Sequence, residues 1–123
     1  MVAKWDVFFL HNCRYTQPSP KNKLIVIAYI EPSPHGFLIN SKINDYLKNN
    51  PRLLPCEALI SSSQHSFLKY DSYVDCRDIF AFLEGELVNP RGSISEKAKQ
   101  TIITAARHCP VLENIHKKRI LNL

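Results

Sequence analysis

The sequence predicts an α+β fold that is mainly β, a small barrel or sheet with an appended helix. Strand-like apolar segments occupy the first two thirds of the chain, and the strongest helical pattern comes only after the break at residues 89–92. Strands first and helices late is typical of α+β chains. With 123 residues, 45% of them apolar and 22% charged, the chain has the size and composition of one folded domain. We expect a single domain over 1–123, with a strand-rich core over 4–88 and a helical part over 93–121.

Three strands are predicted in the first third of the chain. Trp5–Leu10, rich in aromatic residues and valine, is the first. The following segment, His11–Lys23, contains two prolines and several turn formers and is expected to be a long exposed loop. Leu24–Ile30 is a continuous apolar run of strand length and should lie in the core. Two prolines then end that strand, and Gly36 allows a turn into a third strand, Phe37–Ile39.

The middle of the chain is less regular. Lys42–Asn50 is predicted as a short helix with Ser41 as its N-cap. Ala58–Ile60 is an apolar strand, and the run at residues 71–75 is a further short strand. Asp78–Leu83 fits either a strand or a helix, because periodicity cannot decide over so few residues.

The helix near the C-terminus carries the clearest pattern. Ser93 and Glu96 have the spacing of a capping box, in which each side chain satisfies a backbone N–H at the helix start. Pro110 ends the helix, and Val111–Leu121 is expected to be a second helical segment. One apolar stripe of the first helix should face the core, made by Ile94, Ala98, Ile102, Ala105, Ala106 and Cys109.

The charge distribution favours no single partner. The net charge is +5, with basic ends and an acidic middle: residues 51–90 hold six acids against three Lys or Arg. A positive face would suit a nucleic acid or an acidic protein, while a merely solvated basic surface explains the same numbers. The basic run at residues 116–119 is open to the same two interpretations, since cations are also favoured at the end of a helix.

The sequence predicts a cytoplasmic protein without a membrane segment. No apolar run reaches the roughly 18 residues of a membrane helix, and the N-terminus does not have the pattern of a signal peptide. No cofactor is expected; a zinc site using His11 and Cys13 has little support from the spacing. The cysteines lie far apart and are expected to be reduced, mostly buried thiols: Cys13, Cys56, Cys76 and Cys109.

Polar chemistry is concentrated between Ala58 and Cys76, where hydroxyls, an imidazole and carboxylates lie between strand-like segments. Loops held between strands often carry function. Each group also has a plainer interpretation: the serine run as a solvated turn, His65 as a surface residue, and Asp71 as part of an ordinary Asx turn rather than a carboxylate pair with Asp75.

Three short motifs resemble the MazF/PemK-like toxin family. Lys21-Asn22-Lys23-Leu24 stands before an apolar strand, where the family has Lys-x-Arg-Pro. Ser61 and Ser62, after Leu59-Ile60, are similar to the family's Thr or Ser at a strand end, and Trp5-Asp6-Val7 faintly resembles the family's early Gly-Asp start. The resemblance implies an SH3-like barrel, cleavage of single-stranded RNA, and an antitoxin partner that covers the active site.

Under this resemblance the chain is a metal-independent endoribonuclease. Such an enzyme uses the substrate's 2′-hydroxyl as nucleophile and supplies a base, an acid and positive charge for the phosphorane. Lysine gives less geometric control over phosphate than the family's arginine, so Arg14 is expected to assist. The catalytic residues implied are Lys23, Arg14, Ser62 and His65, and the RNA-binding residues are Lys21, Ser61 and Ser63.

The alternative is a non-catalytic SH3-like module that binds a protein or a nucleic acid. The missing Arg-Pro pair favours this alternative, and the polar cluster favours the enzyme. The enzyme interpretation requires that Lys23 or Arg14 point into one cleft with Ser62 and His65. A homodimer is expected under either interpretation, because small barrels often leave an apolar face open.

Overall fold

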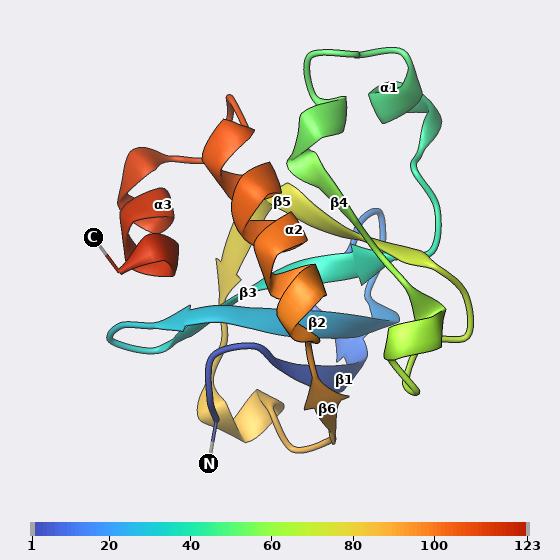
Figure 1. Cartoon of the computed structure of the whole chain (residues 1–123). Coiled ribbons are helices and arrows are strands. Elements are labelled where there is room, and N and C mark those ends of the chain that lie inside the picture. The colour runs from blue at the N-terminus through green and yellow to red at the C-terminus, as the bar shows by residue number, and fades with distance from the viewer. Residues whose placement is uncertain (1, 123) are drawn as a thin grey trace.

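One antiparallel sheet of six strands forms the body of the molecule. The computed structural model describes residues 2–122 (Figure 1). The sheet curls, and its strands lie in the order β4-β5-β3-β2-β1-β6. The strands are β1 Asp6–Cys13, β2 Lys21–Ile30, β3 Pro34–Asn40, β4 Glu57–Ile60, β5 Ser72–Ala81 and β6 Pro90–Ser93. The helices are α1 Asp45–Lys48, α2 Glu96–His108 and α3 Asn114–Leu121. The chain is thus α+β and mainly β, as the sequence predicted.

Each face of the sheet carries its own core, because successive side chains of a strand point to opposite faces. Helix α2 crosses one face (Figure 1), where Ile102 and Ala105 pack on Val26, Phe37 and Val74. A smaller core lies on the other face, built from Phe8, Leu10, Ile25, Ile27, Phe82 and Leu87.

The first two strands are longer than predicted, so the loop expected over His11–Lys23 shrinks to residues 14–20. Cys13 pairs with Lys21 after an irregularity in the register. Asn12 supplies the left-handed residue at this point (φ 51°), a conformation that asparagine tolerates better than most residues. Thr16 closes the loop by accepting a hydrogen bond from the Lys21 amide at 2.7 Å.

Strand β5 joins two segments that the sequence left apart. The short strand expected at 71–75 and the ambiguous segment from Asp78 form one strand, with an irregularity in its pairing to β3. Leu38 lies opposite Asp75 and Gly36 opposite Phe80, so β5 contributes more residues than its partner over this stretch. Such a bulge bends a strand and changes the direction of its side chains.

The two predicted helix caps lie three and two positions before the observed ones. Asn44, not Ser41, caps α1 by accepting from the Leu47 amide at 2.9 Å. Ser95, not Ser93, caps α2 by accepting from the Ala98 amide at 3.2 Å. The expected capping box is therefore wrong, because Ser93 is held in β6.

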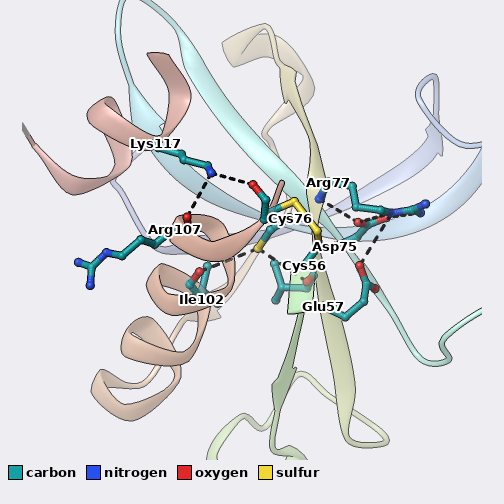
Figure 2. Close-up of a disulfide and its surroundings, with 10 residues drawn as sticks. Cys56, Glu57, Asp75, Cys76, Arg77, Ile102, Arg107 and Lys117 are labelled. Atoms are coloured by element: carbon teal, nitrogen blue, oxygen red, sulfur yellow. Dashed lines mark hydrogen bonds and ion pairs between the residues drawn. A yellow bond between two sulfur atoms is a disulfide. The ribbon is translucent and has the colours of Figure 1, made fainter. Parts of the chain in front are cut away.

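The cysteine prediction is wrong for two of the four residues. Cys56 and Cys109 form a disulfide that joins the start of β4 to the end of α2, with their Cα atoms 4.6 Å apart (Figure 2). Cys13 and Cys76 are free and buried, as expected. The pair is 53 residues apart in sequence, so spacing gives no sign of it. The disulfide removes the argument from cysteines for a reducing compartment. Within residues 2–122, no helix is long and apolar enough to cross a membrane.

Candidate functional site

A cleft of about 650 Å³ lies on the face of the sheet that α2 leaves uncovered. Leu38 and Phe80, which border the smaller core, form its apolar floor. Its charged lining comes from three segments: the loop after β1, the start of β2, and the bulged part of β5. Four cations line it, Arg14, Lys21, Lys23 and Arg77, against two acids, Asp75 and Asp78.

The two lysines, Lys21 and Lys23, lie at the start of β2. Lys23 is only partly exposed, and burial lowers its pKa, with a smaller contribution from the charge of Lys21. A lysine with a lowered pKa gives up its proton more readily than a free one. Lys23 can therefore attract a phosphate and also serve as a proton donor.

Arg77 and Asp75 form an ion pair with two hydrogen bonds in the cleft. The Arg77 Nε and Nη2 atoms donate to the two carboxylate oxygens of Asp75 at 3.0 and 2.9 Å. Burial alone would raise the pKa of Asp75, but the hydrogen bonds from Arg77 outweigh it and hold that pKa below its usual range. A guanidinium has five N–H donors, so the donors not used by Asp75 remain available to a phosphate.

Glu57, at the start of β4, lies behind this pair. It is the cross-strand neighbour of Asp75, and its Oε2 lies 4.0 Å from the Arg77 Nε atom (Figure 2). Its side chain is 1% exposed, and within residues 2–122 no donor group reaches either carboxyl oxygen. Burial, together with a hydrogen bond to Asp75 and the charge of that residue, raises the pKa of Glu57 to about 8.

Arg14 stands at the rim of the cleft rather than at its centre. Its guanidinium is paired with Glu86 at 3.0 Å and lies over the Tyr15 ring, which stacks on Phe80. The hydrogen bonds that Arg14 donates to Glu86 are the main cause that raises the pKa of Arg14. Arg14 therefore contributes positive charge, but it would have to leave Glu86 to grip a phosphate.

The serine run lies elsewhere. Ser61 and Ser63 line a separate cleft of about 320 Å³ between β4 and the first turns of α2. The Ser62 hydroxyl and amide both donate to Asp71, at 3.0 and 2.9 Å, so this carboxylate accepts from a residue nine positions earlier in the chain.

His65 is a structural residue. It is 2% exposed, its Nδ1 donates to the Ser61 carbonyl at 2.7 Å, and its Nε2 accepts from the Ser95 amide at 3.1 Å. With both ring nitrogens occupied and the ring buried, it has no nitrogen free for a proton transfer. The structure therefore does not bring the four predicted catalytic residues together: Lys23 and Arg14 share a cleft, and Ser62 and His65 are outside it.

Sequence reasoning missed Arg77 and Asp78 and gave Asp75 only a tentative place. One signal was present: Asp75 and Arg77 are two residues apart in a strand-like segment, where side chains two positions apart share a face. Asn40 and Asn44 add amide groups to the cleft wall and carried no signal. Within residues 2–122, no three His, Cys, Asp or Glu side chains gather closely enough to hold a metal ion.

Comparison with known proteins places the fold. No family model matches the sequence, and no curated protein matches it. Among solved structures, the chain is similar to the Mycobacterium tuberculosis toxin MazF-mt6, with a TM-score of 0.62 and 12% sequence identity. The similarity covers 88% of this chain and 98% of that toxin chain. The chain therefore has a MazF-like fold, as the resemblance implied, while so low an identity shows the fold alone.

Proposed function

We propose that this chain is a MazF-like toxin that binds single-stranded RNA in the cationic cleft and cleaves it without a metal ion. The observation that carries the proposal is the convergence of Lys23, Arg77 and Asp78 in one cleft of a MazF-like fold. Fold alone does not give function. Ser62 and His65 lie outside this cleft, so the catalytic site predicted from the sequence is wrong and a different set of residues has to be argued for. The proposal therefore rests on what Lys23, Arg77 and Asp78 can do to a phosphodiester.

The reaction requires three contributions from the protein. A base removes the proton of the 2′-hydroxyl as its oxygen attacks the adjacent phosphorus. Cations stabilise the phosphorane, and an acid protonates the 5′-oxygen as it leaves, which yields a 2′,3′-cyclic phosphate and a 5′-hydroxyl. Asp78 is exposed and suits the role of base; Lys23, with its lowered pKa, suits that of acid.

Arg77 fills the gap left by the departure from the family motif. Lys23 stands where the family has arginine, and lysine binds phosphate only as a point charge. Arg77 brings a guanidinium into the same cleft from β5, and the two hydrogen bonds that it donates to Asp75 fix its plane. Lys21 and Arg14 extend the positive lining. RNA binding stays the role proposed for Lys21, and it replaces the catalytic role predicted for Arg14.

The testing experiment is cleavage of a long single-stranded RNA in the presence of EDTA. We expect the wild type to cleave and a Lys23→Ala/Arg77→Ala double variant to lose at least about a hundredfold in rate, because both phosphate-binding cations are removed. Arg52→Ala/Lys118→Ala is the matched control, since it removes one arginine and one lysine that are exposed and outside the cleft. Cleavage that the cleft variant leaves unchanged would contradict the proposal.

A non-catalytic RNA-binding module is the second candidate. Two observations favour it. The lining of the cleft contains no histidine, and the guanidinium of Arg77 already forms an ion pair with Asp75. Under this alternative, the wild type binds a single-stranded oligonucleotide, the cleft variant loses that binding, and neither protein cleaves RNA.

The remaining parts of the proposal concern partners and location. We expect a homodimer, an antitoxin that covers the cleft, and a cytoplasmic location, as the family resemblance and the sequence predicted. A sedimentation measurement that finds only the 14.2 kDa monomer at high concentration would contradict the dimer.

A further inference from the structure

Glu57 is a buried acid with no obvious role. As a carboxylate it would have no hydrogen-bond donor for either oxygen, although its side chain is 1% exposed. Buried polar atoms without a partner are rare and need an explanation. The nearest groups supply one, because a protonated Glu57 can donate to Asp75, the residue opposite it on β5.

The contacts of Asp75 link this proton to the cleft. Asp75 accepts from the Nε, Nη2 and backbone N–H groups of Arg77, at 3.0, 2.9 and 3.1 Å. Three groups thus form a chain from the edge of the sheet to the cleft: Glu57, then Asp75, then Arg77 (Figure 2). Arg77 lies on the bulged part of β5, where backbone pairing to β3 is irregular. Its direction therefore depends on Asp75.

We propose that Glu57 is a positioning residue: in its protonated form it donates to Asp75, which holds the Arg77 guanidinium toward a phosphate bound in the cleft. This inference rests on the proposed function, because it assigns Arg77 to phosphate binding. When Glu57 loses its proton, two neighbouring carboxylates compete for one guanidinium. The cluster then changes from neutral to one net negative charge, which opposes a phosphate.

Other ionisable groups surround Glu57, and their charges also influence a pH-dependent binding measurement. On β5 the free Cys76 thiol is buried, and Asp78 acts on Arg77; burial, Asp75 and Glu57 raise the pKa of Cys76 well above its usual range. On β2, Lys23 interacts with Asp75 and has a lowered pKa, chiefly from burial. Lys97 and His108 of α2 border a groove that Glu57 also lines. These groups are common to all variants, so the comparison between variants isolates Glu57.

The first measurement is the affinity for a single-stranded 2′-O-methyl oligonucleotide between pH 7 and pH 9, by fluorescence anisotropy. This probe lacks the nucleophile, so binding is measured without cleavage. We expect the wild type to lose roughly three- to tenfold more affinity over this range than Glu57→Gln, because one negative charge is added near the bound phosphate. The glutamine keeps a permanent neutral donor toward Asp75. Glu84→Gln, which changes an exposed acid outside the cleft, should behave as the wild type.

Equal pH profiles of the wild type and Glu57→Gln would overturn the inference, provided that urea unfolding shows both to be folded. If neither protein binds at any pH, the proposed function fails. A ¹³C NMR titration of the Glu57 carboxyl group then tests separately whether Glu57 shares its proton with Asp75. A titration near pH 8 that moves in Asp75→Asn would support the pair. A titration near the ordinary glutamate value, unaffected by that substitution, would overturn it.

Discussion

The disulfide between Cys56 and Cys109 should contribute a large part of the stability of this domain. It closes a loop of 53 residues, from the start of β4 through β5 and β6 to the end of α2. In the chain-entropy description, a cross-link over a loop of this length removes about 14 cal/mol/K from the unfolded chain. This corresponds to about 4 kcal/mol at 25 °C, a substantial fraction of the 5–15 kcal/mol typical of a domain.

The perturbation is reduction of the wild type, or the double substitution Cys56→Ala/Cys109→Ala. Either should lower the free energy of unfolding by about 4 kcal/mol and the melting temperature by about 15 °C, from the average unfolding entropy for a chain of this size. Urea unfolding measures the free energy, with and without a phosphine reductant. The double variant should not respond to the reductant.

The matched control is Cys13→Ala/Cys76→Ala, which removes the two free cysteines and leaves the disulfide. This variant loses only the packing of two buried thiols and should keep its sensitivity to reduction. Alkylation of the unfolded, unreduced wild type should label two cysteines. Labelling of all four, or a stability that reduction leaves unchanged, would refute the reasoning.

Three further predictions follow from buried groups. His65→Ala should lower the free energy of unfolding by about 2–4 kcal/mol, since it leaves a buried carbonyl and a buried amide without partners. The folded variant should bind an oligonucleotide, measured by anisotropy, with an affinity within about twofold of the wild type. A large loss of affinity would show that His65 belongs to the binding site. The raised pKa of Glu57 means that the folded state holds a proton that the unfolded chain releases from about pH 4.5 upward. Wild-type stability, relative to Glu57→Gln, should therefore be greatest below that pH and fall by on the order of 3 kcal/mol as the pH rises through about 8; a parallel pH dependence of urea unfolding in both proteins would contradict this. Gly36→Ala should cost about 3 kcal/mol, because the added Cβ would lie 2.6 Å from the Val26 carbonyl oxygen; thermal melting within about 3 °C of the wild type would be the opposite result.

Much of the fold could be predicted because its signals are local. The apolar run of β2 and the helical stripe of α2 are each contained in one segment, and both were placed correctly in kind. The errors lie where a non-local contact decides. Ser93 fits a capping box in sequence, but pairing with Asp6 on β1 holds it in β6. The Cys56–Cys109 pair depends on α2 packing beside β4, which spacing along the chain does not contain.

The candidate site was predicted in part for the same reason. Lys21 and Lys23 were found through a motif that precedes a strand, a local feature. The serine run and His65 were chosen because polar groups are dense there, but density along a chain does not show which groups face one another. His65 could be assigned to the structure only once Ser95, thirty residues later, was seen to donate to it.

Under the proposed function, Arg77 takes the place of the arginine of the family motif. In the family pattern, one arginine before the second strand supplies the guanidinium; here that position is Lys23. The cleft nevertheless receives a guanidinium, because the irregular pairing of β5 with β3 brings Arg77 to the same lining. A guanidinium on a bulge is free to turn, so it needs a fixed acceptor, and Asp75 provides one with both of its oxygens. Asp75 balances the charge of Arg77, so the cluster avoids a net negative charge beside a phosphate only if the next acid stays neutral and acts as a hydrogen-bond donor. The buried Glu57, protonated, is such a donor, so the loss of the motif arginine and the presence of an unpaired buried acid have one explanation.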